Sequence, residues 1–103
     1  MKIYNKIVRD RIPEIIRSDG KECSTRVIEG EEYRSALQEK LGEELAEYAE
    51  SSDPTELADL LEVIYALGSA HGLSPSELED IRSEKEMSNG GFKEGIFLES
   101  VFD

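Results

Sequence analysis

The sequence predicts a mainly α-helical protein with a helical hairpin at its centre. Two long segments, 31–51 and 54–70, carry apolar residues at helical spacing, and little more than the turn-forming pair Asp53-Pro54 separates them. A further helical segment follows, and two short segments near the chain ends are rich in strand-forming residues. At this length we expect a single domain, residues 1–103.

The N-terminal part of the chain predicts one short helix, from Arg11 to Ser18. We expect Asp10 to be its N-cap, and Pro13 falls in its first turn, where the missing N–H costs little. The segments 22–29 and 95–102 are β-prone and flank the helices. We therefore expect them to pair as a small two-stranded sheet packed on the helices.

The later helices carry clear end signals. His71-Gly72 ends the helix 54–70 with a cation-capable residue followed by a C′ glycine. Ser74–Glu77 has the pattern of a capping box with proline at the first helical position. The third helix is therefore expected from residue 75 to about Glu86.

The charge of the chain is strongly acidic and unevenly distributed. There are 24 acidic and 12 basic residues, which gives a net charge of −12. Residues 1–26 carry a net charge of +3, and the rest of the chain carries −15. This balance argues against nucleic acid as a partner, because binding it needs a basic surface. The negative field of the protein also repels a bare phosphate, so a nucleotide substrate would require a divalent cation.

Cysteine content and hydropathy suggest the compartment. Cys23 is the one cysteine, so no disulfide framework is expected. The first residues lack the apolar core of a signal peptide, and no apolar run is long enough to cross a bilayer. We expect a soluble cytoplasmic protein that does not enter a membrane.

The carboxylates of the hairpin are not equivalent on a helical wheel. Glu44 falls inside the apolar stripe of the helix 31–51, and Glu47 lies at its edge. Glu43 points away, towards solvent. In the helix 54–70, Glu56 and Asp59 lie beside apolar positions. The stripe of the first helix consists of Leu37, Leu41, Leu45 and Tyr48.

Folding the two helices into a hairpin brings four of these carboxylates to adjacent levels. Glu44 and Glu47 share one face, as do Glu56 and Asp59, because each pair is three residues apart. Clustered, partly buried carboxylates stay charged only if a cation neutralises them. Oxygen ligands select a hard metal, Mg²⁺ or alternatively Mn²⁺. The chemistry predicted is metal-assisted hydrolysis of a phosphoanhydride.

A simpler interpretation stays open beside this one. Glu56 stands three residues after Asp53 and would serve as its partner in a capping arrangement. Glu47 and Glu50 would be ordinary solvated surface, because runs of charge are usually that. Glu44 is the residue that this interpretation explains worst.

Two acidic motifs and two flanking segments carry a resemblance to a known family. EELAE at 43–47 followed by ELAD at 56–59 resembles the EExxE…ExxD signature of the MazG-like all-α nucleoside triphosphate pyrophosphohydrolases. YNKIVRDRIPEII at 4–16 resembles the start of the phosphoribosyl-ATP pyrophosphohydrolase-like subgroup. GGF at 90–92 and GIFL at 95–98 fit the end of that subgroup. The order and spacing of these motifs make the resemblance specific.

The resemblance implies a MazG-like pyrophosphohydrolase domain whose core is the helical hairpin. It implies Mg²⁺-dependent cleavage of a nucleotide between its α- and β-phosphates, which yields a monophosphate and pyrophosphate. The metal ligands implied are Glu44, Glu47, Glu56 and Asp59, and Glu44 and Glu47 are our candidate catalytic carboxylates. A homodimer or homotetramer is also implied, in which hairpins of two subunits form a four-helix bundle.

Basic residues are needed to hold the phosphates. Lys6 and Arg9 lie in the net-positive segment and are the first candidates, although they would equally form surface ion pairs with the acidic body. The subgroup often has a basic residue just before its Gly-Gly-Phe, where this chain has Asn89. Lys85 or Lys93 is then the expected substitute.

Two other functions compete with this one. The first is hydrolysis of phosphoribosyl-ATP in histidine synthesis, since the motifs do not select the base. The second is a non-catalytic helical interaction module whose acidic face docks a basic partner.

Overall fold

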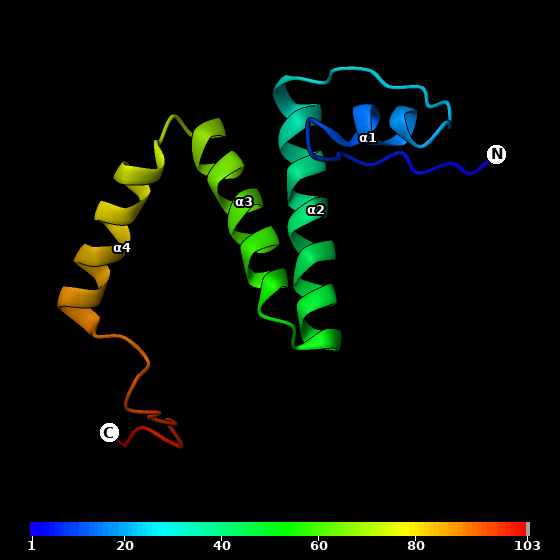
Figure 1. Ribbon diagram of the computed structural model, residues 1–103. Helices are drawn as coiled ribbons and strands as arrows, with labels where there is room; N and C mark the ends of the chain where they lie inside the picture. Colours follow the sequence, from blue (N-terminus) through cyan, green and yellow to red (C-terminus); the bar gives the residue numbers. More distant parts are fainter. Residues whose placement is uncertain (103) are drawn as a thin grey trace.

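Four helices make up the regular structure of this computed structural model, which describes residues 1–102 and leaves Asp103, the last residue of the expected domain, outside (Figure 1). They are α1 (Ile12–Ser18), α2 (Gly30–Ser51), α3 (Thr55–Ala70) and α4 (Pro75–Asn89). The mainly α-helical fold class is confirmed. Helix α4 is longer than expected and continues to the turn at Gly90.

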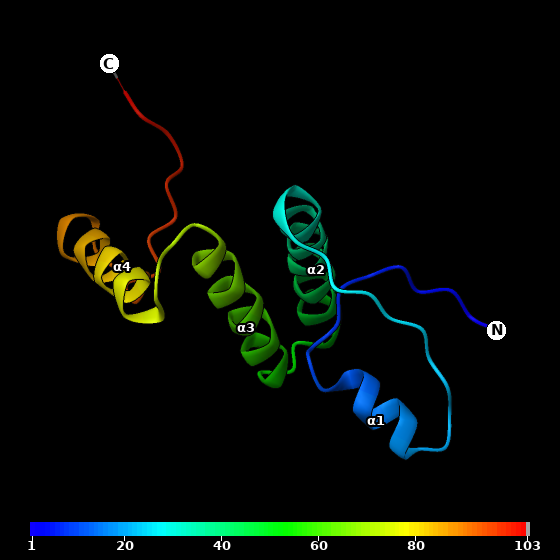
Figure 2. The same cartoon turned by 90° about the horizontal axis from the view of Figure 1, so that it is seen from above.

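The predicted two-stranded sheet is wrong. Residues 22–29 and 95–102 have no regular secondary structure, and no strand occurs anywhere in residues 1–102. The physical reason is distance. Figures 1 and 2 place the segment before α2 and the C-terminal segment at opposite ends of the molecule, so neither backbone reaches the other to form a ladder.

Helices α2 and α3 form the expected antiparallel hairpin (Figure 1). Ser52 ends α2 in the left-handed conformation with φ 54°, and its N–H donates to the Tyr48 carbonyl at 2.8 Å. The Asp53 carboxylate then accepts hydrogen bonds from the N–H and the hydroxyl of Thr55, both at 2.9 Å. Asp53 therefore supplies the side-chain hydrogen bonds at the start of α3, as predicted, although Pro54 is the N-cap residue.

Helix α4 begins with the capping box that the sequence predicts. The Ser74 hydroxyl accepts from the Glu77 N–H, and the Glu77 carboxylate accepts from the Ser74 N–H, each at 3.1 Å. Gly68 near the end of α3 is buried, and a Cβ built on it would lie 3.5 Å from Leu78. The two helices touch at this shared end and then diverge (Figure 2).

The N-terminal region differs in detail from the prediction. Arg11, not Asp10, is the N-cap of α1, because the helix begins one residue later than expected. Within residues 1–102, α1 packs on no other helix. Residues 1–10, which we call the N-terminal arm, lack regular structure and meet the hairpin through charged side chains.

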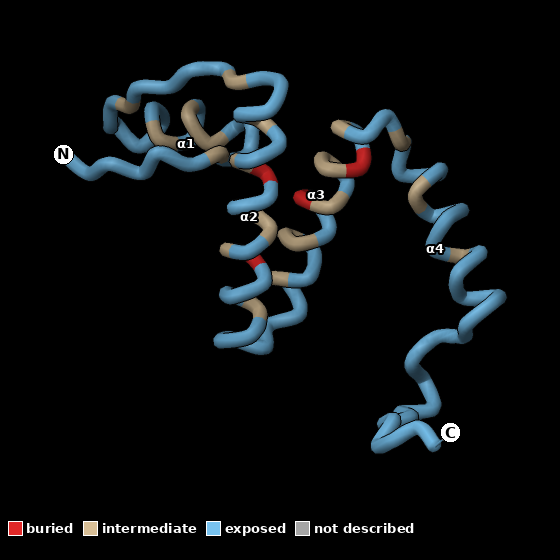
Figure 3. Tube along the Cα trace, turned by 180° about the vertical axis from the view of Figure 1, so that it is seen from behind, coloured by how far each residue is buried: buried red, intermediate tan, exposed pale blue. Residues whose placement is uncertain are grey.

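The core of the single chain is very small. Leu37 and Val63 are the buried apolar residues of the described chain, and Figure 3 shows how little of the trace is buried. Leu45, which the wheel places in the apolar stripe, is 56% exposed. The radius of gyration is 18.1 Å, against about 13 Å for a compact domain of this length. The chain is therefore open, with much apolar surface uncovered.

None of the four helices combines the length and the apolar character needed to cross a bilayer, as far as residues 1–102 are concerned.

Candidate metal site between α2 and α3

The hairpin gathers five carboxylates, which we call the acidic cluster. They come from both helices and fall into two groups, each with ligand oxygens within 4.8 Å of one another. Glu44 belongs to both groups, so it is the centre of the cluster. All four carboxylates that the hairpin argument brings together are included. The groups are Glu43, Glu44 and Glu47, and Glu44, Glu56 and Asp59.

Glu44 is the buried member of the cluster. The residue is only 6% exposed, and one carboxylate oxygen lies 3.2 Å from the Lys40 ammonium. The other oxygen, Oε2, is buried and finds no hydrogen-bond partner among the residues that the structure describes. Burial raises the pKa of Glu44; the charge of Lys40 opposes this, and the negative charge of Glu47 adds to it. A buried carboxylate oxygen without a partner is costly, and a bound cation would satisfy it.

Glu56 faces Glu44 from the other helix. Its pKa is raised first by partial burial and then by the negative charges of Glu47 and Asp59. Within residues 1–102 the structure gives the Glu56 side chain no role in capping α3. The Glu56 N–H donates to the backbone carbonyl of Asp53 at 3.0 Å, while the Asp53 side chain does the capping. The Glu56 carboxylate therefore remains free to act as a member of the acidic cluster.

The N-terminal arm supplies two cations to this cluster. Lys6 lies 2.8 Å from Glu43, and Arg9 lies 2.8 Å from Asp59. Arg9 also reaches Glu62 at 3.6 Å. Glu43 points away from the apolar stripe, and it is half-buried under Lys6, whose hydrogen bond lowers the pKa of Glu43.

Lys40 is a member of the site that the sequence reasoning missed. It lies 3.3 Å from Glu43 and 3.2 Å from Glu44, and its side chain is 17% exposed. The signal was present, since Lys40 precedes these glutamates by three and four residues on one helix. Lys40 compensates the charge of two carboxylates, a role distinct from the phosphate binding expected of the other basic residues.

The charges of the site leave room for a divalent cation. Among the described residues three cations contact the cluster, namely Lys6, Arg9 and Lys40. With all five carboxylates ionised, two negative charges are uncompensated. The donors are oxygens without any nitrogen or sulfur, which suits Mg²⁺ or Mn²⁺ better than zinc. The residues present therefore fit the implied metal, and Glu44 Oε2 is the atom that most needs it.

Lys85 and Lys93 lie elsewhere. Both line a hollow of about 1200 Å³ between the last turns of α4 and the loop that follows it. Figures 1 and 2 both show this end of α4 well separated from α2. Within one chain the structure thus brings Lys6 and Arg9 to the acidic cluster, and it does not bring Lys85 or Lys93 there.

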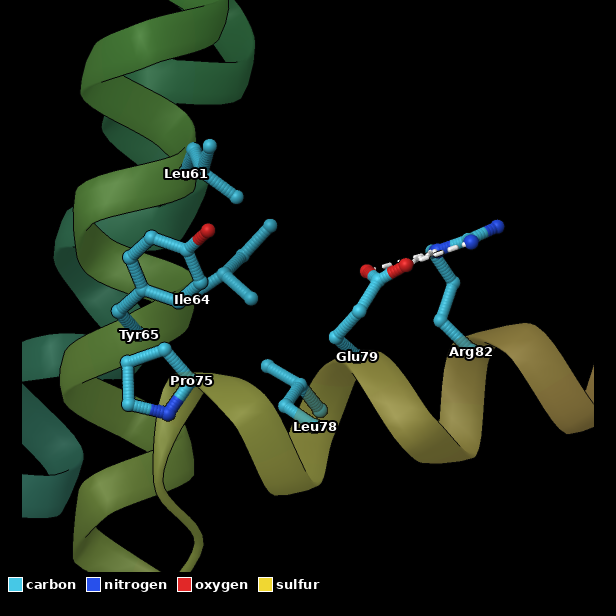
Figure 4. A pocket seen from close by; sticks show the side chains of 7 residues that line it. All are labelled: Leu61, Ile64, Tyr65, Pro75, Leu78, Glu79 and Arg82. Atoms are coloured by element: carbon cyan, nitrogen blue, oxygen red, sulfur yellow. Dashed lines mark hydrogen bonds and ion pairs between the residues drawn. The ribbon is translucent and has the colours of Figure 1, made fainter.

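An apolar groove opens where α3 and α4 meet (Figure 4). Its volume is about 310 Å³. The Glu79–Arg82 ion pair, 2.6 Å long, stands at its rim. Leu61 and Tyr65 remain 44% and 37% exposed in it. Its apolar lining consists of Leu61, Ile64, Tyr65, Pro75 and Leu78.

The stability of the metal-free protein is expected to fall as pH rises through the range above 4.5, the ordinary pKa of these carboxyls. Glu44 and Glu56 have raised pKa values, so the folded state holds protons there that the unfolded chain has released. Glu43 has a lowered pKa and acts oppositely, so its contribution is lost as pH falls below 4.5. Urea unfolding in EDTA between pH 4 and 8 measures this.

The control for the pH dependence is Glu44→Gln, which should flatten the decline above pH 4.5. A free energy of unfolding that rises across this range in the unmodified protein would contradict the prediction.

Comparisons with known proteins add a local likeness. No family model and no solved structure matches this sequence. A curated protein from Mycolicibacterium smegmatis, described as uncharacterized, is 50% identical over 42 residues. The match covers 41% of this chain and 43% of that protein, so the chain spans less than half of the relative's length. The chain is thus similar over this stretch to a protein whose description states no activity.

Proposed function

We propose that the protein is a Mg²⁺-dependent nucleotide pyrophosphohydrolase of the MazG-like type, with the α2–α3 hairpin as its core. The observation that carries the proposal is the buried Glu44 oxygen, which has no hydrogen-bond partner in residues 1–102 and belongs to a cluster of carboxylates from both helices. The spacing of EELAE and ELAD in the sequence supports the same function. A mere solvated surface does not explain a carboxylate that is 6% exposed.

In this proposal Glu44, Glu47, Glu56 and Asp59 hold the cation. When bound, the cation would polarise a phosphate oxygen and make a water more acidic. Glu47 is exposed beside the buried Glu44, so it is the carboxylate best placed to accept a proton from the attacking water. Lys40 holds one oxygen of Glu44 at 3.2 Å and so fixes the orientation of this carboxylate. The negative charge of Glu44 would offset part of the charge of the cation.

Lys6 and Arg9 are the proposed contacts for the phosphates. Both are exposed and already at the edge of the acidic cluster, at 2.8 Å from Glu43 and Asp59. Their charge would compensate the departing pyrophosphate. A phosphate role for Lys85 and Lys93 stays a prediction, which would require them to act on a site in another subunit.

We propose in addition that the working form is a homodimer or homotetramer. The single chain exposes 9169 Å², whereas a folded monomer of 11.6 kDa exposes roughly 5,800 Å². The excess of more than 3,000 Å² per chain is larger than the roughly 1,000–2,500 Å² that each partner contributes to many obligate interfaces. The apolar groove between α3 and α4 and the exposed leucines of the hairpin are the surfaces available for this contact.

The test is pyrophosphate release from a panel of nucleoside triphosphates and phosphoribosyl-ATP, with Mg²⁺ or EDTA. We expect release that requires Mg²⁺ and that Glu47→Gln lowers by about 100-fold or more, the scale seen when a proton-transfer group is removed. Glu50→Gln is the matched control, because Glu50 is an exposed glutamate one turn further along α2 and outside the cluster.

The outcome also separates the competing functions. Turnover confined to phosphoribosyl-ATP would favour the histidine-synthesis enzyme. The enzymatic proposal would be overturned if no nucleotide is turned over and Mg²⁺ does not change the melting temperature. That result would favour the interaction module.

A further inference from the structure

We propose that the N-terminal arm is an exchangeable internal counter-ion for the acidic cluster. Arg9 occupies Asp59 while the site holds no metal, and it leaves Asp59 when a divalent cation binds. This inference rests on the proposed function, because it concerns the loading of the same site. It adds a coupling between the arm and the hairpin, which neither the acidic motifs nor the family resemblance implies.

The contact between arm and hairpin is built from a few charged side chains. Arg9 bridges two residues one turn apart on α3, with 2.8 Å to Asp59 and 3.6 Å to Glu62. Lys6 makes the corresponding contact with Glu43 of α2 at 2.8 Å. Together they place one positive charge on a carboxylate of each helix. The buried Glu44 Oε2 of the same cluster has no hydrogen-bond partner within residues 1–102.

The Arg9–Asp59 pair is suited to exchange. The two side chains are 53% and 42% exposed, and ion pairs that are exposed to this degree are weak. The arm itself has no regular secondary structure that would resist its departure. Lys40 contrasts with it, since its side chain is 17% exposed and sits on the same helix as its partner Glu44. Lys40 therefore stays while Arg9 moves.

A cation bound to Asp59 and a guanidinium 2.8 Å from the same carboxylate repel each other and compete for it. In the metal-free chain the Asp59 carboxylate pairs with Arg9, and in the metal-bound chain it would pair with the cation. Release of Arg9 then frees a guanidinium beside the site, where it suits an anionic phosphate. The order that follows is cation first and phosphate ligand second.

The first experiment measures Mn²⁺ binding to the full-length, metal-free protein by calorimetry without nucleotide. Arg9→Gln removes the competitor, so we expect it to bind Mn²⁺ about two- to fivefold more tightly, the range that corresponds to losing one exposed ion pair. Arg11→Gln is the matched control. It removes the same charge two residues away, where Arg11 pairs, within residues 1–102, only with its neighbour Glu14 at 3.1 Å. Its affinity should equal that of the unmodified protein.

The second measurement follows the arm itself by brief trypsin digestion. Cleavage after Lys6 and Arg9 should accelerate in the unmodified protein when Mn²⁺ is added. Cleavage after Lys21 serves as an internal reference, because Lys21 is exposed and makes no ion pair among the described residues. Arg9→Gln should already show the fast rate after Lys6 without Mn²⁺.

Each outcome either supports or overturns the exchange of Arg9 for the cation at Asp59. If both proteins bind Mn²⁺ equally well, or if Arg9→Gln binds more weakly, the exchange is overturned and the proposed function stands. The same holds if Mn²⁺ binds but leaves cleavage after Lys6 and Arg9 unchanged relative to Lys21. If neither protein binds Mn²⁺, the exchange and the proposed function both fall. If only Arg9→Gln binds it, the competition is stronger than we propose and the exchange is supported.

Discussion

Glu44→Gln is expected to abolish divalent-cation binding and pyrophosphate release while making the metal-free protein more stable. Glu44 is 6% exposed, and no described residue donates a hydrogen bond to its Oε2. The neutral amide removes a buried negative charge next to Glu47 and Glu56, and it keeps nearly the same volume. The free energy of unfolding should therefore rise by about 1 kcal/mol, within the usual range for relieving an unfavourable site.

The loss of function should be large because Glu44 belongs to both ligand groups of the cluster. Even changes to residues that only support a metal ligand cost ten- to 100-fold in affinity or activity. Loss of the central ligand should therefore exceed about 100-fold in Mn²⁺ affinity and in pyrophosphate release. Calorimetry, the pyrophosphate assay and urea unfolding in EDTA at one protein concentration measure the three effects.

Glu50→Gln is the control here too, since it makes the same chemical change at an exposed position of α2. It should alter neither activity nor stability by a measurable amount. A Glu44→Gln protein that is less stable than the unmodified one would show that the Lys40–Glu44 pair outweighs the burial of the charge. A fully active Glu44→Gln protein would remove Glu44 from the site.

Leu61→Asp is expected to dissociate the oligomer and to unfold much of the helical structure with it. Leu61 lies in the apolar groove, 44% exposed, and we propose that a second copy covers this region. A single chain has little to hold it together, since Leu37 and Val63 form the buried apolar core of residues 1–102. An unpaired charge buried at an interface costs about 3–5 kcal/mol, so association should weaken by more than 100-fold.

Analytical ultracentrifugation gives the association state, and circular dichroism over a range of protein concentrations gives the helical content. Ser35→Asp is the matched control, because it adds the same charge at an exposed position of α2 outside the groove. It should leave both readouts unchanged. An unmodified protein that is monomeric, and whose melting temperature does not depend on concentration, would contradict the oligomer proposal.

The helices were predictable because their signals are local. The Asp53 turn, the His71-Gly72 end of α3 and the capping box of Ser74 depend on residues within a few positions of one another. The burial of Glu44 was predictable for the same reason, since it follows from the apolar residues one turn away on its own helix. Convergence with Glu56 needed only one further step, the tight turn.

The differences from the prediction concern residues far apart in the sequence. Segments 22–29 and 95–102 favour extended structure, but a strand needs a partner, and the two ends of the chain do not meet. Glu43 points away from the apolar stripe of α2, as the wheel requires. It is nevertheless half-covered, because Lys6 reaches it from 37 residues earlier. No pattern within α2 encodes that contact.

The sequence by itself determined the helices, their ends and the face on which each carboxylate lies, because backbone hydrogen bonding and side-chain periodicity operate over a few residues. Only the tertiary structure decided which charges meet. Over the described part of the chain, it left Glu44 Oε2 without a hydrogen-bond partner, placed Arg9 on Asp59 across 50 residues, and kept Lys85 and Lys93 away from the cluster. Those outcomes depend on how separate segments pack and on the charge that each one brings.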